Sequence, residues 1–214
     1  GLEYLDNVIL ADLDDNGKVE LIYGSYNCGK NGQGCIIIVM DYILTDSFGS
    51  KKTFFNNNPR DAFYDQNYDD GCIPSYSIYC NYGDIACGRS ITVGQFNGVG
   101  AMDLAFSSGT KYGEKDFVYI VEDLASHFGE GLHVTQCFDS ASADRYANLL
   151  SNLNPAIIDL NDDLGRNSII GAEIEFVDLN NDYKEDLVIT APLYNGGEGK
   201  TMILEGRGDL STRY

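Results

Sequence analysis

The sequence contains no tryptophan, only two histidines, few basic residues and no long apolar run. Without a run of about 18 apolar residues, no segment is predicted to span a bilayer. The 14 Lys and Arg residues stand against 33 Asp and Glu, a formal net charge of −19. Such a charge repels nucleic-acid phosphates and anionic lipid surfaces. We therefore expect no nucleic-acid partner and no direct membrane insertion.

A catalytic constellation is also missing from the sequence. The two histidines, His127 and His133, do not stand beside a Ser, Cys or Asp arrangement that would pair a nucleophile with a base. The acidic residues gather in loops whose composition suits calcium, and carboxylates that saturate a calcium ion are poor acids and bases. We therefore predict no catalytic residues and expect that the protein is not an enzyme.

The six cysteines include no Cys-x-x-Cys pair and no nearby histidine, so a zinc site is not indicated. Disulfides fit an even number better, which predicts an extracellular or cell-surface location. Cys28 and Cys35 enclose a Gly-rich segment between two apolar runs and are predicted to bridge the neck of a hairpin. The other four allow three pairings: Cys72, Cys80, Cys87 and Cys137. The chain begins without a signal stretch and has no Asn-x-Ser/Thr sequon, so secretion would imply a removed signal or a longer chain.

The chain contains an internal repeat. Three segments align, Asp12–Gly24, Gln95–Ser107 and Asp178–Thr190, and their first residues are 83 positions apart each time. Each begins with a polar loop that joins two short apolar stretches, and a Gly-rich turn then leads to a third. Short apolar runs bounded by turn residues are typical of strands. The repeat unit is therefore predicted to be a meander of at least three antiparallel strands.

The predicted strands follow the three repeats in order. First strands are expected at Asn7–Ala11, Ser90–Gly94 and Ile174–Val177, second strands at Leu21–Tyr23, Leu104–Phe106 and Leu187–Ile189, and third strands at Cys35–Met40, Phe117–Val121 and Thr201–Leu204. The stretches 43–86 and 124–165 must hold fourth strands and insertions. Apolar residues at helical spacing behind an Asp-Ser start predict a short helix over Asp139–Leu153.

The first and third polar loops carry oxygen-bearing side chains at alternate positions. Calcium takes six to eight oxygen ligands from carboxylates, amides, backbone carbonyls and water. Positions one, three, five and nine of the first loop are Asp12, Asp14, Asn16 and Glu20, and Lys18 at position seven offers its backbone carbonyl. In the third loop the same positions are Asp178, Asn180, Asp182 and Asp186, with Lys184 at seven. We predict two structural Ca²⁺ sites.

Position six and the middle loop differ between the copies. Gly17 at position six permits a left-handed turn, whereas Tyr183 replaces it in the third loop. In the middle loop Gln95 and Val99 occupy positions one and five, so only two good ligands remain, Asn97 and Asp103. We predict no metal there.

Two other interpretations of the acidic loops were weighed. Asp-Asn-Gly clusters also form turns without any metal, but two complete copies at twice a fixed period favour calcium. An EF-hand needs an acidic residue at position twelve and flanking helices. Tyr23 and Ile189 occupy that position, so an EF-hand is excluded.

The loops and their strands resemble the FG-GAP repeat, the blade unit of the integrin α-subunit β-propeller. The family's Gly-Ala-Pro is replaced by Gly24-Ser25-Tyr26, Ser107-Ser108-Gly109 and Thr190-Ala191-Pro192. The resemblance implies an all-β fold, a β-propeller of four-stranded antiparallel blades, here a single domain over 1–214 with repeats near 1–86, 87–165 and 166–214. Propellers usually have four to eight blades, so the three copies are expected to be part of a larger, seven-bladed type of propeller.

The expected function is that of a calcium-stabilised extracellular propeller that binds another protein, mediates adhesion or assembles with neighbouring subunits into a surface structure. An accessory propeller of a secreted hydrolase, as in some phospholipases, is one alternative. Carbohydrate binding is another, and the absence of tryptophan argues against it. The Tyr-rich and Cys-rich insertion Phe54–Tyr82 is the predicted contact surface, whereas Arg207-Gly208-Asp209 is predicted to be an ordinary turn.

Overall fold

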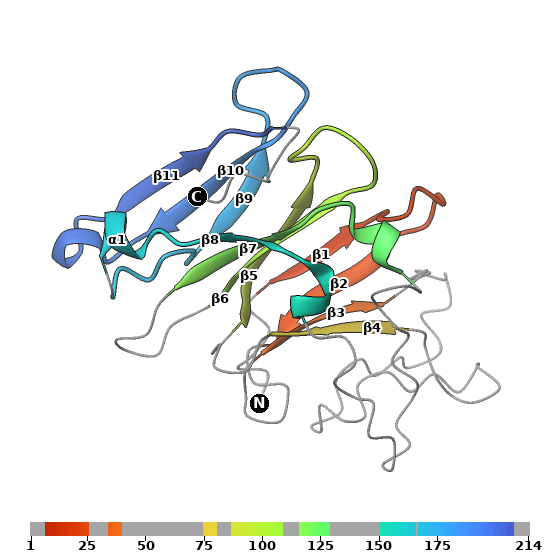
Figure 1. The fold of residues 1–214 in the computed structure, drawn as a ribbon, viewed down its shortest axis with the longest axis horizontal. Coiled ribbons are helices and arrows are strands. Elements are labelled where there is room, and N and C mark those ends of the chain that lie inside the picture. The colour runs from red at the N-terminus through yellow and green to blue at the C-terminus, as the bar shows by residue number, and fades with distance from the viewer. Residues whose placement is uncertain are drawn as a thin grey trace, which may run out of the picture.

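Three antiparallel β-sheets form the framework of the described structure (Figure 1). The computed structural model describes residues 7–25, 34–39, 75–80, 87–108, 116–128, 150–165 and 167–207, and the following statements concern these residues. Sheet 1 has the strand order β1-β2-β3-β4, sheet 2 the order β5-β6-β7-β8, and sheet 3 the order β11-β10-β9. Each sheet is a meander in which strands adjacent in sequence are paired, as the repeat predicted.

The strand bounds agree closely with the predicted apolar runs. Sheet 1 contains β1 (Val8–Ala11), β2 (Glu20–Ser25), β3 (Cys35–Val39) and β4 (Ser75–Tyr79). Sheet 2 contains β5 (Cys87–Gly94), β6 (Asp103–Ser108), β7 (Phe117–Val121) and β8 (Ala156–Ile158). Sheet 3 contains β9 (Ile174–Val177), β10 (Asp186–Ala191) and β11 (Lys200–Leu204). The expected fourth strands of the first two repeats are β4 and β8.

Helices are short in the described part of the chain. They are α1 (Asn161–Leu164) and the 3-10 helices at Leu124–His127, Leu150–Leu153 and Tyr194–Gly196. The helix predicted over Asp139–Leu153 lies outside the described residues except for its last four, which form one of these 3-10 helices. No described helix has the length and apolar character needed to cross a membrane.

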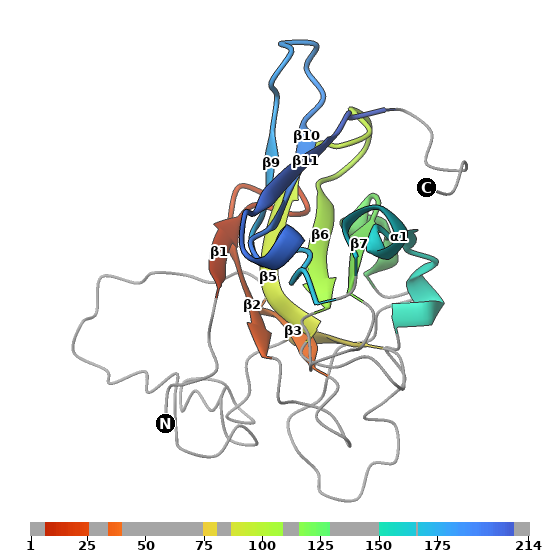
Figure 2. The same cartoon turned by 90° about the vertical axis from the view of Figure 1, so that its left-hand side faces the viewer.

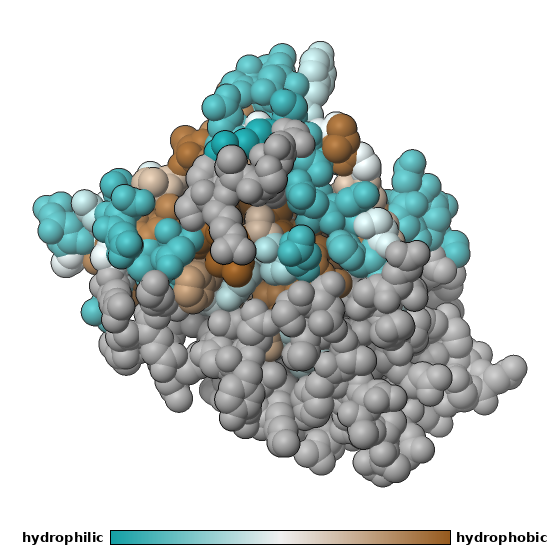
Figure 3. Space-filling model, in the orientation of Figure 1, coloured by the Kyte–Doolittle hydropathy of each residue, from teal (hydrophilic) through white to brown (hydrophobic). Residues whose placement is uncertain are grey.

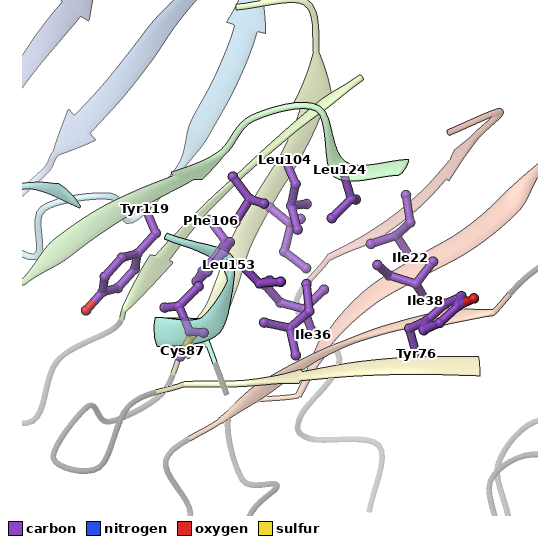
Figure 4. Close-up of a cluster of buried hydrophobic side chains, with 14 of the residues drawn as sticks. Ile22, Ile36, Ile38, Tyr76, Cys87, Leu104, Phe106, Tyr119, Leu124 and Leu153 are labelled. Atoms are coloured by element: carbon purple, nitrogen blue, oxygen red, sulfur yellow. The ribbon is translucent and has the colours of Figure 1, made fainter. Parts of the chain in front are cut away.

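Sheet 2 is buried on both faces because its side chains alternate between two cores. Leu104 and Phe106 of β6 join a cluster with sheet 1 that includes Ile22 and Ile38, and Figure 4 shows these side chains pointing toward one another. Ala105 of β6 and its neighbours on the opposite face join a second cluster with sheet 3. Successive side chains of a strand point to opposite faces, so one strand contributes side chains to both cores.

The first strands of the three sheets bring these layers together. β5 packs against β2 and β1 on one side and against β9 on the other, and it lies between them in both views (Figure 1 and Figure 2). Gly24 of β2 and Gly88 of β5 allow the closest approach, since a Cβ atom at Gly24 would lie 1.7 Å from the carbonyl oxygen of Gly88. Any side chain at Gly24 would therefore separate sheets 1 and 2.

One described disulfide joins sheet 1 to sheet 2. It links Cys80, which follows β4, with Cys87, the first residue of β5, across a Cα–Cα distance of 6.3 Å. This is one of the pairs that the sequence left open. Cys35 is also disulfide-bonded, but Cys28 lies outside the described residues, so the pairing of Cys28 with Cys35 stays a prediction.

Candidate metal centres

The three polar loops follow one backbone path. Each connects the first and second strands of its sheet, and all three lie along the same edge of the molecule (Figure 1). Positions four and six have positive φ in every copy: Asp15 (57°) and Gly17 (83°), Gly98 (73°) and Gly100 (75°), Asn181 (62°) and Tyr183 (68°). L-residues rarely adopt this region, so two left-handed residues per loop make a shared and specific turn.

The first loop gathers three acidic side chains. Ligand oxygens of Asp12, Asp14 and Glu20 all lie within 4.8 Å of one another. Two oxygens on opposite sides of a calcium ion lie about 4.6–5.2 Å apart, twice the Ca–O bond length. Asp14 is exposed, Asp12 is half-buried and Glu20 is buried. The donor set and its spacing therefore fit a hard divalent cation bound at the rim of sheet 1.

Hydrogen bonds within the first loop hold these side chains in place. Asp12 accepts the backbone N–H of Asn16 at 3.1 Å and of Gly17 at 2.8 Å. The side-chain oxygen of Asn16 accepts the N–H of Lys18 at 2.9 Å. Glu20 accepts the N–H of Leu13 at 2.7 Å. Because alternate side chains turn inward toward the wrapped backbone, the loop is preorganised before any ion binds.

The third loop repeats this hydrogen-bond pattern. Asp178 accepts the N–H groups of Asp182 at 3.2 Å and Tyr183 at 3.0 Å. Asn180 and Asp182 accept from the N–H groups two residues further on, at 2.9 Å each. The N–H of Leu179 donates to Asp186 at 3.3 Å. The structure thus places the five predicted residues of this loop, Lys184 included, as their counterparts in the first loop.

The two loops differ in how closely their acidic groups approach. Within the described ranges, three acidic side chains come within 4.8 Å of one another in the first loop alone. The third loop has the amide of Asn180 where the first has the carboxylate of Asp14, and both oxygens of Asp186 accept backbone N–H groups, one of them from Gly206 at 2.9 Å. The first loop is therefore the stronger candidate centre.

In the middle loop, the polar side chains at positions one and nine form hydrogen bonds with backbone groups of the protein. Asp103 accepts three backbone N–H groups, from Phe96 at 2.9 Å, Asn97 at 3.2 Å and Asp123 at 2.8 Å. The side-chain amide of Gln95, where the other loops have aspartate, donates to the carbonyl of Gly100 at 3.0 Å. These contacts keep the turn without the aspartate at position one, and the absence of a metal in this loop stays a prediction.

Burial changes the acidity of Asp103. Its side chain is fully buried, and removal from water raises its pKa from 3.8 to about 6. The charge of Glu122 also raises the pKa, by less, whereas the three backbone hydrogen bonds lower it. Asp116, buried where β7 begins, behaves in the same way, with a pKa of about 6. One oxygen of Asp116 accepts the N–H of Ile170 at 3.1 Å, and this bond ties sheet 2 to the turn before β9.

The middle and third loops are joined by Glu185, which the sequence analysis did not single out. The N–H of Glu185 donates to the carbonyl of Gln95 at 2.9 Å, and its carboxylate accepts the N–H of Gln95 at 2.5 Å. Gly94 makes room for this carboxylate, since a Cβ atom there would lie 1.9 Å from it. Position eight is apolar in the other two loops. The acidic residue at this position in the third loop was therefore the feature of the sequence that could have singled out Glu185.

Hydrophilic residues gather over the edge that carries the loops (Figure 3). Of the other sequence candidates, His127 ends a 3-10 helix, while His133, Gly208, Asp209 and most of the insertion Phe54–Tyr82 are outside the described residues.

The chain was compared with known families and with curated proteins. No family model matches it, and no curated protein matches it significantly.

Proposed function

We propose that this protein is a calcium-stabilised, extracellular interaction module whose sheets are the blades of an FG-GAP-type β-propeller. The observation that carries the proposal is the cluster of Asp12, Asp14 and Glu20 in a preorganised loop. The repetition of its hydrogen-bond pattern in the third loop supports a second, weaker site. The ion acts structurally, since it neutralises carboxylates that otherwise repel one another.

Calcium in this role favours the folded state because only the folded loop holds the ligands together. When the free calcium concentration is about 100 times the dissociation constant, one site stabilises the fold by about 2.7 kcal/mol. The chain carries a net charge of −19, so the neutralisation of two acidic loops also reduces repulsion along the edge that carries them.

The packing of the sheets supports the blade assignment. Sheet 2 contributes to a core on each face, and β5 lies against the first strands of both neighbours. The exposed apolar residues of the outer sheets support a role in protein binding, since Val8 and Leu10 of β1 are 53% and 51% exposed and Ile203 of β11 is 59% exposed.

Thermal unfolding with and without calcium tests the metal role. We expect excess calcium to raise the melting temperature over that in EDTA, and magnesium at the same concentration to raise it less, because Mg²⁺ demands a smaller octahedral site. Asp12→Asn should reduce the calcium-dependent increase, and the matched variant Asp162→Asn, on the exposed surface of α1, should leave it intact. Equal melting curves in calcium and EDTA would rule out the proposal.

A further inference from the structure

Each of the two described joints between neighbouring sheets contains a hydrogen bond between a side chain and the backbone of the next first strand, with the side chain as donor in one joint and as acceptor in the other. The side-chain amide of Asn7 donates to the carbonyl of Ile91 at 2.8 Å, and the N–H of Ile174 donates to the hydroxyl of Ser90 at 3.0 Å, each across 84 residues. Since the repeats are 83 residues apart, Asn7 corresponds to Ser90, and Ile91 to Ile174. The side chain of Asn7, just before β1, and that of Ser90 on β5 thus each contact the backbone of the next first strand.

A second contact of the same kind lies two residues along. The N–H of Phe176 donates to the hydroxyl of Thr92 at 3.2 Å, again across 84 residues. Side chains two apart on a strand share a face, so Ser90 and Thr92 together present a pair of acceptors to β9. The joint between sheets 2 and 3 therefore rests on two successive hydroxyl-to-backbone hydrogen bonds.

The backbone groups that receive these side chains belong to edge strands. β1, β5 and β9 each lie at one edge of their sheet, and an antiparallel edge strand bonds its neighbour through every second residue. The N–H of Thr190 in β10 donates to the carbonyl of Glu173 at 3.0 Å, so Ile174 and Phe176 direct their N–H groups away from β10. β1 pairs Val8 with Tyr23 in the register in which β9 pairs Ile174 with Ile189. Val8 and Leu10 are therefore the equivalent residues of β1, and their N–H groups are assigned the same direction, away from β2.

The first strand of sheet 3 and the residue before it carry the next pair of acceptors. Glu173 and Glu175 stand 83 residues after Ser90 and Thr92, and both are exposed. In the described part of the chain, no hydrogen bond or ion pair reaches either carboxylate. One chain thus has the acceptor half of a joint on sheet 3 and the donor half on sheet 1.

We propose that a second copy of this chain docks head to tail, with β1 of one copy against β9 of the other. Glu173 and Glu175 accept the N–H groups of Val8 and Leu10 of the second copy, as Ser90 and Thr92 accept those of Ile174 and Phe176. Both sets repeat every two strand residues, about 6.8 Å, so their spacing matches. Hydrogen bonds to a carboxylate are stronger than those to a hydroxyl.

The exposed apolar residues at the two ends fit the same joint. Val8 and Leu10 are about half exposed on β1, and Ile203 is 59% exposed on the face of sheet 3 that carries Glu175, since β10 pairs Val188 with both residues. A head-to-tail contact closes into a ring when its rotation allows. The three sheets described in each of two copies together make six, within the usual range of four to eight blades.

The inference deepens the proposed function by naming its partner, and it rests on the blade assignment but not on calcium. The test is the mass of the 214-residue chain by light scattering after gel filtration, in calcium and in EDTA. We expect twice the 23.5 kDa of one chain, and more association at high than at low salt, because salt screens the repulsion between two acidic chains. A single-chain mass at every concentration and salt would overturn the proposal.

Two variants test the two halves of the joint. Glu175→Lys on sheet 3 and Leu10→Asp on β1 should each give single chains, whereas the matched exposed changes Asp162→Lys and Val99→Asp should leave the paired mass unchanged. Circular dichroism and melting curves like those of the controls show that the two variants still fold. If either variant still pairs, the joint is not the one proposed.

Mixing the two variants tests the head-to-tail arrangement itself. In a mixed pair, one joint combines both substitutions and the other is wild type, so mixing should restore the paired mass at higher concentration. A mixture that stays single-chain would overturn the head-to-tail geometry. A wild-type chain that pairs in EDTA as in calcium, with unchanged melting, would count against the metal role while the joint stands.

Discussion

Replacing the buried carboxylate at position nine separates the role of the turn from that of the ion. In the middle loop, one oxygen of Asp103 accepts the N–H groups of Phe96 and Asn97, and the other accepts that of Asp123. In Asp103→Asn, one oxygen becomes an NH₂ group that faces a backbone donor. At least one buried N–H then loses its acceptor, at about 1–3 kcal/mol.

For a chain of this size that loss corresponds to about 2–12 °C in melting temperature. The decrease should be the same in calcium and in EDTA, because the middle loop lacks the aspartate that the other two loops have at position one. The matched substitution in the first loop, Glu20→Gln, removes both an acceptor for Leu13 and a member of the acidic cluster. It should therefore also reduce the calcium-dependent increase.

Differential scanning fluorimetry of wild type and both variants, in calcium and in EDTA, measures the two effects. If Asp103→Asn reduces the calcium-dependent increase as much as Glu20→Gln, the middle loop binds metal and the reasoning about its ligands is wrong. If Asp103→Asn melts within about 1 °C of wild type in both buffers, the three buried hydrogen bonds do not stabilise the fold.

Three further outcomes follow from the described contacts. In EDTA, stability should rise as the pH falls from 7 to 5, because the folded pKa values of Asp103 and Asp116, about 6, lie above the unfolded value of 3.8 and the folded chain takes up protons first; urea titrations at both pH values measure this. Gly94→Ala should cost about 1–3 kcal/mol through its clash with Glu185, and less when combined with Glu185→Ala in a double-mutant cycle. Gly17→Ala should cost about 1 kcal/mol, read from the melting temperature, because φ is 83° and no neighbouring atom lies within 4 Å of the new methyl group.

Much of the architecture could be predicted because the repeat constrains it. A strand such as β9 is bounded by turn residues on both sides, and its apolar side chains must enter a core, so its bounds agree with the predicted run Ile174–Val177. β8 is only three residues long and has no polar alternation. The sequence could place such a strand only within the long stretch 124–165.

The first and third polar loops could be located for the same reason, since their candidate ligands are local in sequence. Long-range contacts could not. Asp123 reaches the middle loop from beyond β7, and Glu185 reaches it from another sheet. No repeating residue pattern in the sequence signals either contact, because each depends on how separate elements pack. The Cys80–Cys87 pairing is similar, because it depends on the end of β4 and the start of β5 approaching to a Cα–Cα distance of 6.3 Å.

The three loops together indicate what the fold requires of this turn. Left-handed residues at positions four and six are common to all copies, and so is a carboxylate at position nine that accepts the N–H of position two. The aspartate at position one and the oxygen ligand at position five are present only in the first and third loops. The shared features close the hairpin, and only the variable ones are candidate ligands. Under the proposed function, calcium therefore adds stability to a turn that the chain already forms.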